Sequence, residues 1–379
     1  MAGTAVRTDR PDAPSRGSGG PALHLLHVVG ARPNLPKLAP VHRAAARRGF
    51  RQTVVHTGQH YDDALSAALF RDLDLSSPDL NLEVGSHTHA VQTARVMERL
   101  EPVIEQAAPD WVVVYGDVNS TLAAALVSAK LGVPCAHVEA GLRSGDRRMP
   151  EEINRIVADR LASLLLPPSR DAERVLLAEG EPREEIVFVG NVMIDSTLHA
   201  LPKARARVSP GGTGPAPVIV TLHRPSNVDD PVRLGQLGAA LSAIAAERPV
   251  IFPVHPRTRA RLAAGRVSMP SVQLVEPAGY VEMLSLVDRA HAVITDSGGL
   301  QEETTVLGVP CFTVRETTER PITVSEGTNV MAWDPLRLPG LVRAARRPAS
   351  VRAPEGWDGR AGERIVDALT THVVAGRPQ

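Results

Sequence analysis

The feature of this sequence that most constrains its fold is an alternation that runs twice along the 379 residues. Short apolar runs such as LHLLHVVG and DWVVVYGD alternate with longer segments that read as helices. Strands that are apolar throughout, separated by about ten or more helical residues, form parallel sheets covered on both faces. The alternation therefore predicts an α/β fold.

The alternation has an interruption near the middle of the chain. The first half contains LHLLHVVG, RQTVVHTG, DWVVVYGD and PCAHVEAG, and we expect a helix over residues 151 to about 166 after the last of them. Residues 203–217, KARARVSPGGTGPAP, predict a linker or exposed loop because they are rich in glycine and proline. The pattern then restarts with VIVTLHRP, PVIFPVHP, SVQLVEP, AVITDSGG and PCFTV.

A chain of this length usually needs more than one core. We therefore predict two Rossmann-like, doubly wound domains that face each other across a cleft, the first over residues 21–195 and the second over residues 196–359. Residues 1–20 have no apolar core and predict a disordered tail, and residues 360–379 predict a terminal helix.

Composition limits the partners of the chain. Lysine plus arginine equals aspartate plus glutamate at 42 each, so no net charge steers the protein towards nucleic acid or an acidic membrane. Cys135 and Cys311 each lie within a short apolar run, which is typical of buried, reduced thiols. No signal-peptide core and no apolar run of about twenty residues is present. These observations predict a soluble, cytoplasmic protein that binds neither nucleic acid nor membrane.

Ligands of open parallel sheets bind at the carboxyl ends of the strands. Nearly every predicted strand here ends in polar, ionisable or glycine residues, which predicts one shared site. The residues at these strand ends are 30–33, 58–60, 116–117, 139–141, 223–224, 255–257 and 296–299.

A group of these residues is suited to an anion. Ser297, Gly298 and Gly299 lie at a strand-to-helix turn, where free N–H groups and the helix dipole favour a diphosphate, although a plain tight turn is an alternative. Arg32 and Lys37 offer cations for the opposite side of such a diphosphate.

Carboxylates form a second group. Asp117 and Glu139 follow neighbouring strands, and Glu151 and Glu152 start the next helix, where Glu152 could equally be an ordinary first-turn residue. Clustered carboxylates in a partly closed site shift one another's pKa and so create acid and base partners. Histidines at the strand ends of the second domain, His223 and His255, predict at least one further functional group.

Metal and cofactor motifs are missing. The sequence contains no CxxC, no HExxH and no DxDxD, and no GxGxxG follows the first strand. We therefore expect neither a metal site nor a nicotinamide cofactor.

The motifs as a set resemble the non-hydrolysing UDP-N-acetylglucosamine 2-epimerases. The resemblance extends from about residue 24 to residue 330, in the family's order. Its motifs are GARPNLPKLAP, TGQHYD, YGDVNSTLAA, HVEAGLRSGDRRMPEEINR, VGNVMID, TLHRPSNVDD, PVHPRTR, TDSGGLQEE and RETTERPITVSEGTN.

The resemblance implies a fold of the glycosyltransferase-B type, UDP in the cleft, a homodimer and a terminal helix that packs back on the first domain. It implies reversible epimerisation at C2 of UDP-N-acetylglucosamine to UDP-N-acetylmannosamine by elimination of UDP to 2-acetamidoglucal and readdition. Surface polysaccharide biosynthesis is one pathway in which such a product is used.

Residue roles follow from the same motifs. The resemblance implies catalytic roles for Asp117, Glu139, Glu151 and His223. Gln59 and His60 resemble the region where some bacterial members bind a second, activating substrate molecule. The residues that it implies for binding of UDP and the sugar are Arg32, Lys37, His255, Ser297, Gly298, Gly299, Glu303 and Arg320.

Some positions depart from the family pattern, and other activities remain open. Asn34 replaces a glutamate of the first loop, and Pro225 and Ser226 follow His223-Arg224. One alternative is a hydrolysing epimerase that releases N-acetylmannosamine and UDP, although Val118 stands where those enzymes carry an arginine. The others are an epimerase for another UDP-sugar in secondary metabolism, a glycosyltransferase and a catalytically inactive UDP-sugar sensor.

Overall fold

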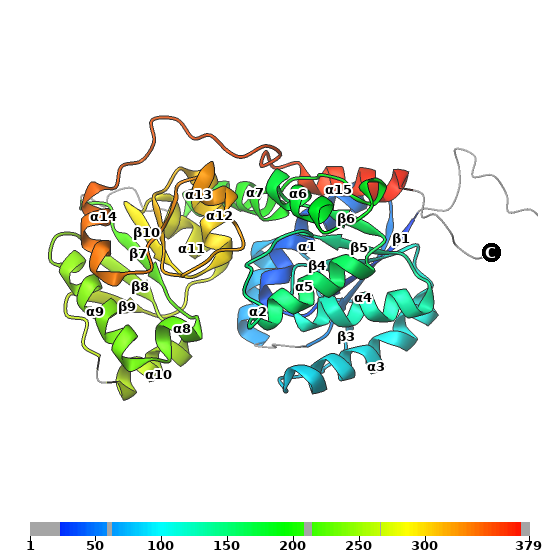
Figure 1. Ribbon diagram of the computed structural model, residues 1–379, viewed down its shortest axis with the longest axis horizontal. Coiled ribbons are helices and arrows are strands. Elements are labelled where there is room, and N and C mark those ends of the chain that lie inside the picture. Colours follow the sequence, from blue (N-terminus) through cyan, green and yellow to red (C-terminus); the bar gives the residue numbers. More distant parts are fainter. Residues whose placement is uncertain (1–22, 59–62, 208–213, 266, 373–379) are drawn as a thin grey trace, which may run out of the picture.

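The computed structural model describes residues 23–58, 63–207, 214–265 and 267–372. The predicted tail, and Gln59 and His60, lie outside these residues. The described chain forms two lobes, each built around one sheet (Figure 1).

The first lobe contains a six-stranded parallel sheet with the order β3-β2-β1-β4-β5-β6. Its strands are β1 (His24–Val29), β2 (Arg51–His56), β3 (Leu80–Asn81), β4 (Trp111–Tyr115), β5 (Cys135–Val138) and β6 (Leu164–Leu166). Its helices are α1 (Leu35–Arg47), α2 (Asp63–Asp72), α3 (His89–Ala107), α4 (Asn119–Leu131), α5 (Pro150–Leu161), α6 (Arg170–Ala178) and α7 (Val192–Ala206), with short 3-10 turns η1 (Arg32–Asn34) and η2 (Arg183–Glu185).

The second lobe repeats this topology with the order β12-β11-β10-β7-β8-β9. Its strands are β7 (Val218–Thr221), β8 (Val250–Pro253), β9 (Val272–Val275), β10 (Ala292–Thr295), β11 (Cys311–Thr313) and β12 (Asn329–Met331). Its helices are α8 (Pro225–Val228), α9 (Pro231–Ala245), α10 (Pro256–Ala264), α11 (Tyr280–Asp288), α12 (Gly298–Leu307), α13 (Ile322–Ser325) and α14 (Leu338–Ala344), with the 3-10 turn η3 (Pro335–Arg337).

Each sheet is covered on both faces, as its apolar strands require. Alternate residues of β1 enter different cores, since Leu25 packs with α1 whereas Leu26 packs with α3 and α4. The second sheet is flanked by two cores in the same way. Two Rossmann-like sheets of identical strand order confirm the predicted fold class.

The strand order also says where a ligand belongs. Doubly wound sheets bind ligands where the order reverses, next to the first and fourth strands of the unit. Those strands are β1 and β4 in the first lobe and β7 and β10 in the second. The predicted site residues Arg32, Asp117, His223 and Ser297 follow these four strands directly.

Two expectations about local structure were wrong. The helix expected to reach residue 166 ends at Leu161, and residues 164–166 form β6 beside β5, because Pro167 and Pro168 stop a helix and the three leucines are fully buried. Helix α7 extends to Ala206, so residues 203–206 of the predicted loop are helical, as residues such as lysine and alanine favour.

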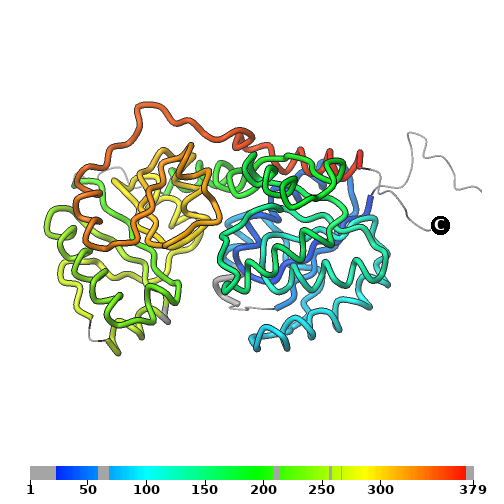
Figure 2. The backbone as a smooth tube through the Cα atoms, in the orientation of Figure 1, coloured from blue at the N-terminus to red at the C-terminus, as the bar shows by residue number. Residues whose placement is uncertain are grey.

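The chain passes between the lobes twice. Helix α7 packs against α1 of the first lobe and against α11 of the second. After α14 the chain returns to the first lobe, where α15 (Ala361–Thr371) packs on α1, as the tube also shows (Figure 2). Ile365 and Leu369 of α15 belong to the core of the first lobe, so this last helix completes that domain. Among the described residues, none of the helices has the length and apolar character that a membrane crossing requires.

Candidate active site

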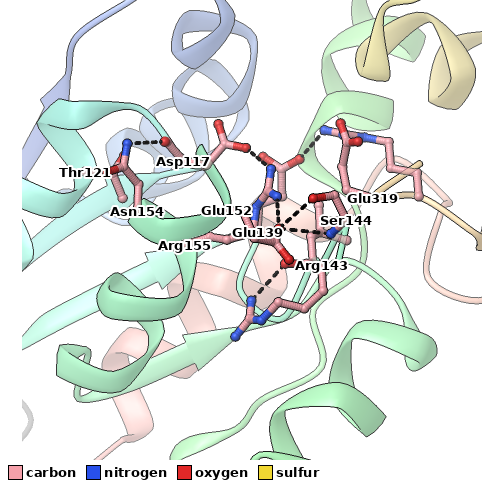
Figure 3. A network of polar contacts seen from close by, with 12 residues as sticks. Asp117, Thr121, Glu139, Arg143, Ser144, Glu152, Asn154, Arg155 and Glu319 are labelled. Atoms are coloured by element: carbon pink, nitrogen blue, oxygen red, sulfur yellow. Dashed lines mark hydrogen bonds and ion pairs between the residues drawn. The ribbon is translucent and has the colours of Figure 1, made fainter. Parts of the chain in front are cut away.

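A buried network of opposite charges lies where the two lobes meet, and two of its carboxylates, Asp117 and Glu139, follow strands of the first sheet (Figure 3). The two lobes touch there through an ion pair, since Arg320 Nη2 of the second lobe lies 2.7 Å from Glu139 Oε1 of the first. Both side chains are at least nine-tenths buried. Glu139, a predicted strand-end residue of the first sheet, therefore lies in direct contact with the second lobe.

Glu139 occupies the centre of this network. It follows β5 in the left-handed backbone region, with φ of 76°, which is uncommon for a residue other than glycine. Its carboxylate is ion-paired with Lys37 of α1 and with Arg320. Gly116 leaves room for this pair, because a Cβ there would lie 2.5 Å from Lys37 Nζ and 3.2 Å from Glu139 Oε2.

Asp117 lies beside Glu139 at the end of β4. Its carboxylate is ion-paired with Arg155 of α5, and its backbone carbonyl accepts a hydrogen bond of 2.9 Å from Asn154 Nδ2 (Figure 3). Burial alone would raise the pKa of Asp117, but the cations of Arg155, Lys37 and Arg320 outweigh burial and lower it. Asp117 therefore stays ionised at neutral pH and can act as a base.

The two glutamates at the start of α5 have different environments. Glu152 is buried and accepts hydrogen bonds from Ser144 N at 2.9 Å, from Ser144 Oγ at 3.0 Å and from Gly145 N at 2.9 Å. Glu152 is also ion-paired with Arg155, so it anchors the loop between β5 and α5. Glu151, the residue predicted to be catalytic, is exposed on the first turn of the helix.

Arg320 also lies close to two carboxylates of the second lobe. Its Nε lies 2.8 Å from Glu302 Oε1 and its Nη1 lies 2.5 Å from Glu319 Oε1. Burial would raise the pKa of Glu319, but Arg320 and Arg315 hold it well below its usual range. Burial raises the pKa of Glu302, against the opposing charge of Arg320. Arg320 therefore stands among three buried carboxylates, since Glu139 completes the set.

The predicted anion turn begins α12, next to Arg320. Ser297 is the N-cap residue, and its Oγ accepts from Leu300 N at 3.5 Å. A Cβ on Gly298 would lie 2.5 Å from Arg320 Nη1, so the guanidinium packs directly on the glycine backbone. A helix N-terminus beside an arginine is a favourable place for a phosphate group.

His223 lies on the other side of this turn, after β7. Its side chain is 54% exposed, and its Nδ1 lies 2.8 Å from Asp296 Oδ1. Asp296 is fully buried and also accepts from Arg224 N at 3.0 Å and from Asn227 Nδ2 at 3.0 Å. Because an ionised carboxylate only accepts hydrogen bonds, the proton lies on Nδ1 and the opposite nitrogen of His223 is left for a ligand.

Glu303, expected to bind ribose, is buried in α12. Burial and the nearby carboxyl of Glu302 raise the pKa of Glu303 to about 8, while a hydrogen bond with Tyr280 acts in the opposite direction. The folded protein therefore binds a proton at Glu303 at neutral pH that the unfolded chain releases.

This proton gives a testable pH dependence. An acid whose pKa is raised on folding stabilises the fold below its unfolded pKa and loses that contribution as pH rises through the folded value. The stability of the wild-type protein should fall between about pH 5 and pH 8, by up to about 1.4 kcal/mol per pH unit from this group. Glu303→Gln should remove this slope in urea unfolding, whereas Glu282→Gln, at an exposed position of α11, should retain it. Parallel pH profiles for the wild-type protein and Glu303→Gln would exclude the buried proton.

The remaining predicted binding residues, Arg32 and His255, are less buried than the charged network. Arg32 is half-buried in η1, directly after β1, and His255 is exposed in the short link between β8 and α10. Asn34, which departs from the family pattern, is buried and holds the loop after β1. Its Oδ1 accepts hydrogen bonds from Gly30 N and Ala31 N at 3.1 Å, and its Nδ2 donates to Tyr115 O at 2.7 Å.

Within the described residues, no group of three or more His, Cys, Asp or Glu side chains could hold a metal ion.

Several members of the site were not singled out from the sequence. They are Arg155, Arg315 and Glu319. The spacing of four between Arg315 and Glu319 in RETTER was the available signal, because it suits an ion pair, here with 2.6 Å between Arg315 Nη2 and Glu319 Oε2.

Two Rossmann-like domains of the glycosyltransferase-B type, with a charged site at the strand ends between them, define the class of this protein. Comparison with known proteins gives the family. A family model described as UDP-N-acetylglucosamine 2-epimerase matches residues 42–370. The chain belongs to the UDP-N-acetylglucosamine 2-epimerase family.

Individual relatives agree with this assignment. The UDP-N-acetylglucosamine 2-epimerase of Methanocaldococcus jannaschii is 39% identical, over 92% of this chain and 99% of that protein. Its crystal structure in complex with UDP-GlcNAc and UDP superposes with a TM-score of 0.83 at 38% identity, covering 92% of this chain and 99% of that one. A UDP-2,3-diacetamido-2,3-dideoxy-D-glucuronate 2-epimerase of Pseudomonas aeruginosa is 42% identical, over 82% of this chain and 88% of that protein.

Proposed function

We propose that this enzyme interconverts UDP-N-acetylglucosamine and UDP-N-acetylmannosamine without hydrolysis. The observation that carries the proposal is the buried contact between Glu139 of the first lobe and Arg320 beside the α12 turn of the second. This contact supports a site in which acid-base groups of the first lobe would act on a sugar whose diphosphate is bound by the second. The structure of the M. jannaschii relative with UDP-GlcNAc and UDP supports the same ligand here.

The diphosphate would bind between the lobes. The N-H groups of Ser297, Gly298 and Gly299 and the guanidinium of Arg320 would hold it from one side, and Arg32 and Lys37 from the other. Glu303 would accept hydrogen bonds from the ribose, and His255 would contact the UDP moiety. These cations stabilise the negative charge that UDP gains as it leaves.

The chemistry requires two coupled bond changes at the sugar. The bond from C1 to the diphosphate oxygen breaks with its electron pair going to UDP, and a base removes the proton from C2, whose electrons form the C1–C2 double bond of 2-acetamidoglucal. Asp117 and Glu139 would act as the bases and acids, and Glu151, on the exposed first turn of α5, would be the third carboxylate of the set. Readdition of UDP to C1 with protonation of C2 from the opposite face completes the epimerisation.

His223 would act at the leaving group, because its free ring nitrogen faces away from Asp296 and the residue lies near the anion turn. Asp296→Asn would remove the carboxylate that holds the proton on Nδ1. We expect turnover to fall about tenfold or more, with UDP affinity changed by less than about threefold. Asp288→Asn, at another position of the second lobe, disturbs an ion pair with Arg205 of α7 and is the matched control. Full activity of Asp296→Asn would remove the pair from the mechanism.

A second candidate function has a specific observation behind it. The 42% identity to the P. aeruginosa enzyme for a diacetamido-glucuronate nucleotide favours a different UDP-sugar as substrate. The elimination and readdition would be the same, because they involve only C1, C2 and the diphosphate. Further parts of the proposal are a homodimer and a role in polysaccharide biosynthesis, which follow from the family resemblance, and a cytoplasmic location, which the sequence predicts.

Product analysis tests the function. Purified protein is incubated with UDP-N-acetylglucosamine, and in parallel with UDP-2,3-diacetamido-2,3-dideoxyglucuronate, and the products are separated by anion-exchange chromatography. We expect UDP-N-acetylmannosamine from the first substrate, with the nucleotide still attached. Free N-acetylmannosamine with UDP would mean a hydrolysing enzyme, and conversion of the second substrate alone would establish the second candidate.

A further inference from the structure

A fully buried histidine lies beneath the proposed catalytic carboxylates and has no part in the mechanism above. His137 is the third residue of β5, and its side chain is 0% exposed. Its Nδ1 lies 2.6 Å from Asp159 Oδ1 of α5, and its Nε2 lies 2.8 Å from the carbonyl oxygen of Gly116. Both ring nitrogens are therefore within hydrogen-bond distance of oxygen atoms.

Both of these oxygens are acceptors. The carbonyl of Gly116 can only accept, and the second oxygen of Asp159 is already surrounded by donors, with Gly141 N at 3.1 Å and Arg143 Nη1 at 2.7 Å. Both of these donors, the amide of Gly141 and the guanidinium of Arg143, favour the ionised form of the Asp159 carboxyl independently of His137. A neutral imidazole has one N–H and could satisfy one of the two contacts.

We propose that His137 carries a proton on both ring nitrogens and is a positioning residue, whose two N–H groups tie Gly116 to α5 and so hold Asp117 and Glu139 in their catalytic arrangement. Gly116 directly precedes Asp117. Gly141, which donates to the other oxygen of Asp159, lies two residues after Glu139. The ends of β4 and β5 are thus both linked to Asp159, the end of β4 through His137 and the end of β5 through Gly141.

The strained backbone at Glu139 explains why the links to Asp159 are needed. Its left-handed φ of 76° is unfavourable for glutamate, so the surrounding contacts must impose it. The hydrogen bond to Gly141 fixes the chain on one side of Glu139, and β5 with His137 fixes it on the other. A displacement of about 1 Å in a catalytic group can lower the rate about a hundredfold, so a rigid support has a measurable effect.

The charges around His137 balance. Arg143, which pairs with Asp159, also forms two hydrogen bonds with Glu179, at 2.9 and 2.7 Å. The imidazolium and Arg143 therefore face two carboxylates, which is the condition under which buried charges are tolerated.

His27 on the neighbouring part of the same sheet shows the opposite case. It is also fully buried, but its partners are the hydroxyl of Tyr115 at 2.8 Å and Gln52 Oε1 at 3.0 Å. A hydroxyl can donate as well as accept, so a neutral imidazole satisfies both contacts. Burial lowers the pKa of His27 to about 3, in keeping with a neutral ring. Burial alone therefore does not decide the charge of a histidine in this sheet, whereas the partners do.

Nitrogen NMR of the wild-type enzyme, with histidine labelled at both ring nitrogens, tests the charge directly. At neutral pH we expect both nitrogens of His137 to carry protons and one nitrogen of His27 to carry a proton, with assignment by His137→Gln and His27→Gln. A single proton on the His137 ring would overturn the proposal, and this result does not depend on what the enzyme converts.

Kinetics test the positioning role, which rests on the proposed function. The amide nitrogen of His137→Asn can replace Nδ1 and that of His137→Gln can replace Nε2, so each variant retains one of the two bonds. We expect kcat to fall at least about tenfold in both, with KM and UDP affinity within about threefold, whereas His27→Gln should retain kcat.

The outcomes distinguish failure of the positioning role of His137 from failure of the proposed enzyme function. Variants of His137 that fold and retain kcat would overturn the positioning role. A wild-type protein that converts no UDP-sugar would instead refute the proposed function, while the NMR result would still stand or fall by itself. If neither variant folds, triple-resonance assignment of the wild-type protein identifies the His137 ring signals, and its nitrogen spectrum decides the proposal.

Discussion

Glu139→Gln is expected to lower the turnover of UDP-N-acetylglucosamine at least about a hundredfold. An amide cannot take up or deliver the proton at C2, and loss of general acid-base catalysis has an effect of this size. The substitution is nearly isosteric, so Lys37 and Arg320 remain in place. Because Arg320 keeps its ion pairs with Glu302 and Glu319, the phosphate-binding side of the site should survive.

UDP affinity separates this explanation from a general loss of structure. In calorimetry the dissociation constant for UDP should change by less than about threefold in Glu139→Gln. Glu105→Gln, on the exposed face of α3, should match the wild-type enzyme in both measurements. If Glu139→Gln retained turnover within about twofold of wild type, Glu139 would not belong to the catalytic groups.

Arg320→Met is expected to have the largest effect on stability. It removes the cation that stands among Glu139, Glu302 and Glu319 and leaves three buried carboxylates with less compensation. Breaking a buried ion pair by removing one partner costs about 3 to 5 kcal/mol. We expect a loss of this size in the free energy of unfolding, together with loss of measurable UDP binding.

Two further variants test the electrostatic cause. Arg183→Met removes an exposed arginine that pairs with Glu173, and it should cost less than about 1 kcal/mol. Adding Glu302→Gln to Arg320→Met should restore part of the stability, because one uncompensated charge is gone and the two effects are not additive. Equal stability of Arg320→Met and Arg183→Met would show that the buried network contributes little to the fold.

Much of the fold could be predicted from the sequence because parallel strands are continuous apolar runs. All nine apolar runs, from LHLLHVVG to PCFTV, contain strands of the two sheets. Strands β3, β6 and β12 were missed because they have two or three residues, too few to show a pattern. In LASLLLPP, the leucines of β6 continue the apolar content of α5, and tertiary pairing with β5 decided their structure.

Part of the site could be predicted because the topology of the sheet brings strand ends together. Strand ends of a doubly wound sheet converge whatever the sequence between them, so the proximity of Asp117 and Glu139, at the ends of neighbouring strands, followed from strand order alone. Adjacent residues such as Glu151 and Glu152 could not be separated in this way. Their exposure depends on the loop of residues 142–149, whose conformation has no periodic signal.

Side-chain pairing across the domains was also beyond the sequence. Arg320 and Glu139 are 181 residues apart, and nothing local indicates that they meet. The charge of His137 likewise depends on which oxygens surround it. Such contacts arise from packing, and they are where the structure adds most to the account.

In the proposed reaction C2 of the sugar is deprotonated as UDP leaves C1, and UDP adds back before it is released; exchange of the C2 proton with solvent tests this sequence. UDP-N-acetylglucosamine is incubated with the wild-type enzyme in deuterium oxide, and C2 is followed by proton NMR. The account predicts loss of the C2 proton signal in step with the appearance of deuterated UDP-N-acetylmannosamine. Formation of UDP-N-acetylmannosamine that keeps its C2 proton, or no conversion by enzyme that binds UDP-N-acetylglucosamine, would contradict it.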